Sequence, residues 1–194
     1  MRISDDHGQI VVATDEGKMT VFNNDLEILK SSPPAKDDIE VVTSISPIVG
    51  GRFLVSRESL GAVIDDRPVN RLEFWHVKEG LLELVEIPSR ATCIQDSGDG
   101  YYVGCFEGEL LWIERGKDPT LLTNLGYSIT DLRIWEGDIL ASCWFYARRI
   151  SPEGIEKWVF EHPRIISKIL SLGQGTIALV SDKDSSGSGS LISL

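Results

Sequence analysis

A short pattern of apolar residues and glycine recurs four times along this chain, and it limits the possible folds more than any other feature. In each copy an apolar pair three residues apart is followed, five or six residues later, by a glycine and then by an apolar run. The copies start 49, 38 and 37 residues apart, and the first spacing falls to about 38 if residues 58–70 contain an insertion. Such a period indicates an array of similar units that bury their apolar faces against their neighbours. The copies are Val42 and Ile45 with Gly51, Ala91 and Ile94 with Gly100, Ile129 and Leu132 with Gly137, and Ile166 and Ile169 with Gly175.

Short β-type runs fill these units, whereas apolar residues at helical spacing are scarce. Turns rich in Gly, Asp and Asn separate the runs, which is typical of antiparallel hairpins. Residues 11–22 and 102–113 have the same layout, an apolar run, a Glu-Gly pair and a second apolar run. The sequence therefore predicts an all-β fold. The predicted strands are Gln9–Thr14, Met19–Phe22, Phe53–Ser56, Leu72–Val77, Leu81–Ile87, Tyr101–Cys105, Leu110–Ile113, Ile139–Trp144, Trp158–Phe160 and Ile177–Ser181.

Two further phrases, Gly108-Glu-Leu-Leu-Trp112 and Ser151-Pro-Glu-Gly-Ile-Glu-Lys-Trp158, combine a turn glycine with a strand that ends in tryptophan. With a period near 38 that holds three or four strands, the chain resembles the blades of β-propeller proteins of the WD-repeat and quinoprotein-like families. The Gly-His and Trp-Asp dipeptides of WD repeats and a complete quinone-cofactor motif are absent. The resemblance therefore implies a propeller without a cofactor, and a β-sandwich is the alternative fold.

The length of 194 residues corresponds to about five such blades in a single domain, residues 1–194. The first and last blades are thin, so two arrangements are open. One is a closed five-bladed ring, which the soluble, charged composition favours. The other is an incomplete propeller that a missing segment or a second chain completes, for example in a homodimer. The expected blades are residues 1–32, 40–87, 90–122, 128–160 and 165–194.

The resemblance also implies a binding face, because the loops between the second and third strands of each blade lie beside the linkers that join successive blades. Function concentrates in loops that a rigid scaffold holds in place. The insertion Glu58–Asn70 lies on this face and pairs an apolar run with charged residues, which favours a hairpin tip or a docking segment. Its candidate partner-binding residues are Leu60, Val63, Ile64, Asp65, Asp66 and Arg67.

A basic–aromatic cluster, Trp144–Arg149, lies near the same face in an otherwise acidic chain. Aromatic residues and arginine are the residue types that anchor protein interfaces. We therefore take Tyr146, Arg148 and Arg149 as candidate partner contacts, together with His162 of the following linker. Because neighbouring strand residues point to opposite faces, one arginine is expected to face solvent and the other to pair with a carboxylate.

Charge narrows the classes of partner. The chain has 19 Lys and Arg against 30 Asp and Glu, a net charge of −11. This balance argues against nucleic acids and anionic membranes as partners and favours proteins with a basic surface. The chain has no apolar run of the roughly 18–20 residues that span a bilayer, and its charged start is unlike a signal peptide. We therefore expect a cytoplasmic protein, in which Cys93, Cys105 and Cys143 are small buried side chains.

No catalytic motif is present, and the three histidines are isolated from any nucleophile. Gly173-Gln-Gly-Thr-Ile-Ala178 precedes a β-type run and is therefore a turn rather than a dinucleotide site. Asp182–Gly187 begins like a calcium loop, but its twelfth position is Ser193 instead of glutamate, so no metal site is expected. The sequence predicts a non-enzymatic protein-interaction scaffold. The alternative is an enzyme or small-ligand sensor with a site at the mouth of the channel.

Overall fold

Nineteen strands form five antiparallel sheets in the described part of the computed structural model, which comprises residues 2–6, 8–14, 17–32, 40–59, 68–173, 175–181 and 191–193. Each sheet is a meander in which strands that follow one another in the sequence are neighbours. We call the sheets blades 1 to 5. Blade 1 contains β1 (Arg2–Asp6), β2 (Gln9–Ala13), β3 (Met19–Asn23) and β4 (Ile28–Ser31). Blade 2 contains β5 (Glu40–Ile45), β6 (Arg52–Ser59), β7 (Asn70–His76) and β8 (Gly80–Glu86).

Blades 3 and 4 also have four strands each, whereas blade 5 has three. No strand pair crosses between blades, so every β-ladder of the described residues lies within one blade. Blade 3 contains β9 (Ala91–Asp96), β10 (Tyr101–Cys105), β11 (Glu109–Ile113) and β12 (Thr120–Asn124). Blade 4 contains β13 (Ile129–Trp135), β14 (Asp138–Cys143), β15 (Tyr146–Ile150) and β16 (Glu156–Glu161). Blade 5 contains β17 (Ile166–Gly173), β18 (Thr176–Ser181) and β19 (Leu191–Ser193).

The repeated glycine of the sequence pattern marks the turn between the first two strands of a blade. Gly51, Gly137 and Gly175 have φ of 77°, 79° and 75°, a left-handed conformation that glycine adopts without a steric penalty. Gly100 is required for a different reason, because a Cβ atom there would lie 2.6 Å from the ring of Trp112. The pattern therefore reflects both turn conformation and close packing.

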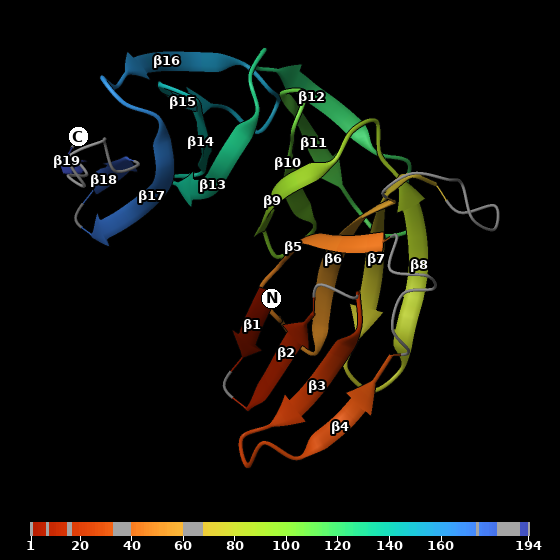
Figure 1. The fold of residues 1–194 in the computed structure, drawn as a ribbon. Helices are drawn as coiled ribbons and strands as arrows, with labels where there is room; N and C mark the ends of the chain where they lie inside the picture. Colours follow the sequence, from red (N-terminus) through yellow and green to blue (C-terminus); the bar gives the residue numbers. More distant parts are fainter. Residues whose placement is uncertain are drawn as a thin grey trace.

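The blades pack face to face in sequence order and form an arc (Figure 1). The first strands of successive blades, β1, β5, β9, β13 and β17, are neighbours along its inner side. Each junction has its own apolar core. Val11 and Val21 pack on Phe53 between blades 1 and 2, and Ala147 packs on Ile177 between blades 4 and 5. The propeller prediction and the number of blades are thus confirmed, and the sandwich alternative is wrong.

The five described blades do not close into a ring (Figure 1). Blade 5 packs on blade 4 and not on blade 1, so the arc remains open between its first and last sheets. The closed five-bladed ring that the composition favoured is therefore wrong for the described residues. The strong contacts between blades run only from each blade to the next in the sequence, which leaves the first and last described blades apart.

Charged residues are also buried within the arc. Arg57 donates to Glu73 at 2.9 Å, and Arg71 contacts both Glu73 at 3.1 Å and Glu40 at 2.7 Å, with all four side chains buried. Arg57 also donates to the carbonyl of Gly17 at 2.7 Å. Through Arg57 and the carbonyl of Gly17, this network joins blade 2 to blade 1. No described helix is long and apolar enough to cross a membrane.

Candidate functional site

The tight turn between β14 and β15 displays a strained aromatic residue. Cys143 pairs with Tyr146, so only Trp144 and Phe145 form the turn. Trp144 has a φ of 53° although it carries a bulky side chain, and this left-handed conformation costs roughly 1–2 kcal/mol for a residue with a Cβ atom. The turn is held from outside, because the carbonyl of Trp144 accepts the N–H of Ile166 at 2.7 Å and that of Phe145 accepts the N–H of His162 at 2.6 Å.

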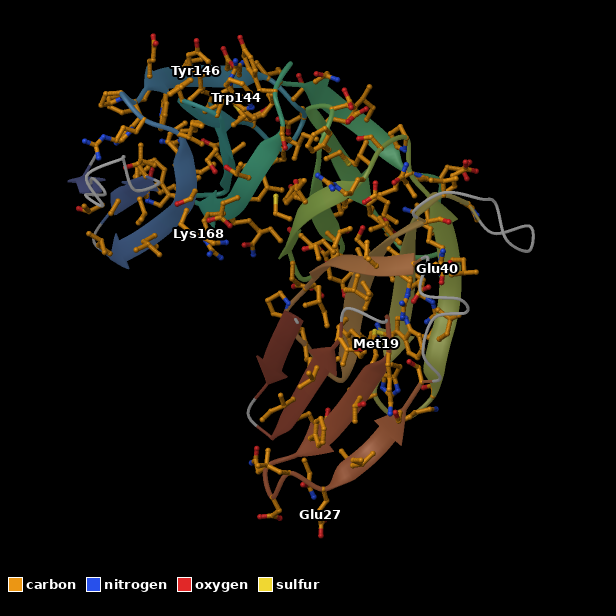
Figure 2. All side chains as sticks on the ribbon, in the orientation of Figure 1. Met19, Glu27, Glu40, Trp144, Tyr146 and Lys168 are labelled. Atoms are coloured by element: carbon orange, nitrogen blue, oxygen red, sulfur yellow. The ribbon has the colours of Figure 1, made fainter. Side chains whose placement is uncertain are left out.

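Exposed aromatic rings gather around this turn. The ring of Tyr127, from the linker between blades 3 and 4, lies 5.8 Å from that of Trp144 and 5.7 Å from that of Tyr146. Trp144 is 47% exposed and Tyr127 is 41% exposed. Figure 2 shows Trp144 and Tyr146 next to each other, away from Lys168 on blade 5. We call Tyr127, Trp144 and Tyr146 the aromatic cluster. The backbone hydrogen bonds of Trp144 and Phe145 fix the turn that carries Trp144 and leads into Tyr146.

The two candidate arginines lie on opposite faces of β15, as the strand geometry predicts. Arg148 lies 5.4 Å from the ring centre of Tyr146 and donates to Glu156 at 2.7 Å, which places it beside the aromatic cluster. The predicted division between a solvent-facing arginine and a paired arginine is wrong, because Arg149 is paired as well.

Arg149 is part of a separate group on the face toward blade 5. It donates to Asp138 at 2.5 Å and to Glu136 at 3.3 Å, and it lies 4.5 Å from the ring centre of Trp135. Hydrogen bonds from Lys157 and from Arg149 hold the pKa of Asp138 below its ordinary value. Arg149 therefore orders blade 4 and is separated from the aromatic cluster by the sheet.

His162 is not a surface contact. Its side chain is 1% exposed, and its Nδ1 atom accepts the backbone N–H of Arg164 at 3.0 Å. A side chain this deeply buried cannot contact a partner without unfolding of the linker. The expectation that His162 binds a partner directly is therefore wrong, and the residue shapes the linker that holds the Trp144 turn.

The corresponding turn of blade 3 repeats the combination of aromatic ring and arginine. Phe106 is exposed, and the guanidinium of Arg90 lies 4.5 Å from the centre of the Phe106 ring. The backbone N–H of Phe106 donates to the carbonyl of Arg90 at 2.8 Å. Arg90 also pairs with Glu58 at 3.5 Å, at the start of the insertion. The sequence indicated only that Phe106 and Tyr127 lie in loops. It did not show that the ring of Phe106 lies beside Arg90, or that the ring of Tyr127 lies beside Tyr146, which Arg148 contacts. Leu60, Val63, Ile64, Asp65, Asp66 and Arg67 lie outside the described residues.

The inner side of the arc also brings charged groups together. A groove of about 500 Å³ between the first strands of blades 2 to 5 contains Asp131, Arg133 and Lys168. Asp131 accepts the N–H of Ile169 at 2.9 Å and lies 3.3 Å from Lys168, while Arg133 donates to the carbonyl of Ile169 at 3.0 Å. These groups therefore join blade 4 to blade 5. No group of three potential metal ligands occurs among the described residues.

The cysteines have an apolar setting. All three are buried and free, as predicted. Burial raises the pKa of Cys93 and of Cys105 to about 12, and it also raises the pKa of Cys143. All three thiols belong to the apolar cores between blades, so the cysteines are packing residues.

Comparison with solved structures agrees with this geometry. The C-terminal WD40 domain of Sif2 superimposes with a TM-score of 0.74 at 18% identity, over 100% of this chain and 54% of that domain. The WD40 β-propeller domain of Doa1 gives a TM-score of 0.72 at 14% identity, over 98% of this chain and 61% of the other. The chain has a propeller-type repeat fold.

A protein of unknown function from Bacteroides caccae is also similar, with a TM-score of 0.70 at 14% identity over 99% of this chain and 76% of that one. No family model and no curated protein matches the sequence. The propeller chain spans little more than half of the Sif2 domain, and identities this low show a shared fold only.

Proposed function

We propose that this propeller is a protein-interaction scaffold that binds a partner through its loop face, with the aromatic cluster as the anchor. The observation that carries the proposal is the exposed Trp144, which the two backbone hydrogen bonds hold in a strained conformation. Backbone strain of this kind concentrates at functional sites. Tryptophan, tyrosine and arginine dominate the energy of protein interfaces, and Arg148 lies against Tyr146 of this cluster. Propellers of the WD40 type commonly serve in protein interaction.

The charge of the chain supports a partner with a basic surface. A net charge of −11 creates a negative potential that speeds the approach of a basic protein. Glu58, the first residue of the predicted insertion, reaches the same face, because it pairs with Arg90 beside Phe106. In this proposal the aromatic cluster supplies most of the binding affinity, and the negative charge of the chain speeds association and favours basic partners over acidic ones.

Replacement of Trp144 by glycine tests the proposal without loss of the fold. Glycine relieves the strain at φ 53°, which offsets part of the loss of the Trp144 ring contacts, so Trp144→Gly should keep the fold while it removes the ring. We expect recovery of protein partners on the tagged full-length chain to fall about tenfold or more, as at other tryptophan anchors. Quantitative mass spectrometry of partners captured from native lysate measures the change.

Ile155→Gly is the matched control, because Ile155 is an exposed apolar residue in the turn between β15 and β16. It should leave partner recovery unchanged. Equal recovery by wild type and Trp144→Gly, with the fold intact by circular dichroism, contradicts the proposed site.

A further inference from the structure

Three arginines in the described part of the chain lie over an aromatic ring, and each of them is also paired with a carboxylate. The guanidinium carbon lies 4.5 to 5.4 Å from the ring centre. The carboxylate oxygens lie 2.5 to 3.5 Å from the same guanidinium groups. The three combinations are Arg90 with Phe106 and Glu58, Arg148 with Tyr146 and Glu156, and Arg149 with Trp135, Glu136 and Asp138.

This combination matches the chemistry of the guanidinium group. The group is planar and packs flat on an aromatic ring, while the N–H groups at its edge stay free to donate to a carboxylate. The ring and the carboxylate therefore act on different sides of the same cation. An aromatic ring with a carboxylate beside it is, by this chemistry, a binding site for arginine.

The aromatic cluster has such a ring and carboxylate, but within the described part of the chain no arginine lies over the ring of Trp144. The carboxylate is that of Glu161 in β16, which lies directly opposite Tyr146 in the sheet. Residues directly opposite each other in antiparallel strands share a face, with Cβ atoms about 5 Å apart. The next residue, His162, donates its N–H to the carbonyl of Phe145, which holds Glu161 beside the turn.

Glu161 differs from the other glutamate of its strand. Glu156 accepts from Arg148 at 2.7 Å, whereas Glu161 is exposed and forms no ion pair with any described residue. An exposed carboxylate alone is ordinary surface chemistry. Its place next to three exposed or half-buried rings is what gives Glu161 a binding partner to supply.

The arrangement of the rings selects among cations. The plane of Tyr127 is tilted by 35° from that of Trp144 and by 31° from that of Tyr146, so the rings form a row and do not enclose a space. A flat guanidinium can lie on such a row, whereas a methylated ammonium is bound by rings that surround it. The ammonium of lysine is compact and strongly hydrated, and it loses more hydration on a ring than a guanidinium does.

We propose that the aromatic cluster and Glu161 bind an arginine side chain of the protein partner. Its guanidinium lies over the ring of Trp144 and donates to the carboxylate of Glu161. This inference rests on the proposed function and specifies the partner's chemistry, an exposed arginine in a basic segment. The net charge of −11 attracts that segment, and the ring with its carboxylate selects arginine within it.

An NMR titration with short peptides tests the recognition directly. The probe is acetyl-Gly-Arg-Gly-amide, added to the ¹⁵N-labelled chain, and the indole N–H signal of Trp144 is identified by its absence from Trp144→Gly. We expect this signal to shift and to saturate. The citrulline peptide, which has a similar shape without the charge, should bind about tenfold more weakly, and the lysine peptide should also bind more weakly than the arginine peptide.

Glu161→Gln tests the carboxylate. It should weaken the affinity for the arginine peptide about threefold, as expected for loss of an exposed ion pair. Glu86→Gln is the matched control, because Glu86 is an exposed strand glutamate of blade 2, and it should leave the affinity unchanged. An unshifted Trp144 signal, equal binding of the arginine and citrulline peptides, or equal affinity of wild type and Glu161→Gln overturns the inference.

Capture of native partners separates this inference from the proposed function. Glu161→Gln should lower, about threefold or more, the recovery of the same partners that Trp144→Gly loses, and Glu86→Gln should retain them. If Trp144→Gly loses partners that Glu161→Gln keeps, the inference is overturned and the proposed function stands. If Trp144→Gly keeps every partner, the proposed function is contradicted, and the peptide titration decides the arginine site by itself.

Discussion

At the scale of single residues, hydroxyl and carboxylate groups determine how the blades are fastened to one another. Thr130 of blade 4 donates a hydrogen bond to the carbonyl of Ile166 in blade 5. Within blade 4, the carboxylate of Asp138 accepts hydrogen bonds from Arg149 and Lys157. The sequence predicted that Arg148 and Arg149 point to opposite faces, because strand periodicity is a local property. It did not predict the carboxylate partners or the burial of His162, because these depend on contacts between segments that are distant in the sequence. The left-handed Trp144 has no sequence signal, since its turn is held by hydrogen bonds from His162 of the next linker and from Ile166 at the start of β17.

Thr130→Val removes the hydrogen bond to Ile166 but keeps the shape of the side chain. We expect the free energy of unfolding to fall by about 1–2 kcal/mol, because the buried carbonyl loses its donor. Urea unfolding measures the change. Thr130→Ser keeps the hydroxyl and should lose less, so equal destabilisation by both substitutions contradicts a role for the hydrogen bond.

Asp138→Asn should make the stability of the protein less dependent on pH. The hydrogen bond from Lys157 and the one from Arg149 lower the pKa of Asp138 in the folded state, so its contribution is present above the ordinary carboxyl pKa. This contribution is lost as the pH falls through the lowered value. Asp138→Asn should therefore be less stable than wild type at pH 7, and the difference should shrink below about pH 4. Urea unfolding at both pH values measures it, and the exposed Asp118→Asn is the control. A difference that is constant with pH contradicts this assignment.

At the scale of elements, the second strand of every blade was predicted, whereas the first strand of every blade and the third strands β15 and β19 were not among the predicted strands. The predicted strand Gln9–Thr14 is observed as β2 (Gln9–Ala13), and Ile139–Trp144 is observed as β14 (Asp138–Cys143). The outer strands β4 and β12 were missed, because most of their side chains are exposed and show no alternation of apolar and polar residues. Each of these two strands is placed by its hydrogen bonds to the third strand of its blade, and this pairing cannot be read from the sequence of the outer strand alone.

Turn glycines give a test at this scale. Gly154 has a φ of 86°, and a Cβ atom there would lie 2.3 Å from the carbonyl oxygen of Leu122 in blade 3. Gly154→Ala should therefore lower the free energy of unfolding by about 2 kcal/mol or more, since it adds a clash between blades to backbone strain. Gly137→Ala is the matched control, because its φ of 79° is similar but a Cβ atom meets nothing within 4 Å. Chemical denaturation that shows equal losses contradicts the blade contact.

At the scale of the whole molecule, the repeat period predicted the number of blades but not the closure of the ring. The period measures how much chain one blade uses. Closure depends on the angle between adjacent sheets, which side-chain volumes at every junction set together and which no local pattern encodes. The result is an open arc with a loop face that displays aromatic rings in its middle.

Small-angle X-ray scattering of the monomeric chain tests this architecture most directly. An open arc should give a radius of gyration above the value of about 16 Å for a compact domain of this length, with a distance distribution that matches the five-bladed arc. A radius of gyration near 16 Å, together with the distance distribution of a closed five-bladed ring, would contradict the account.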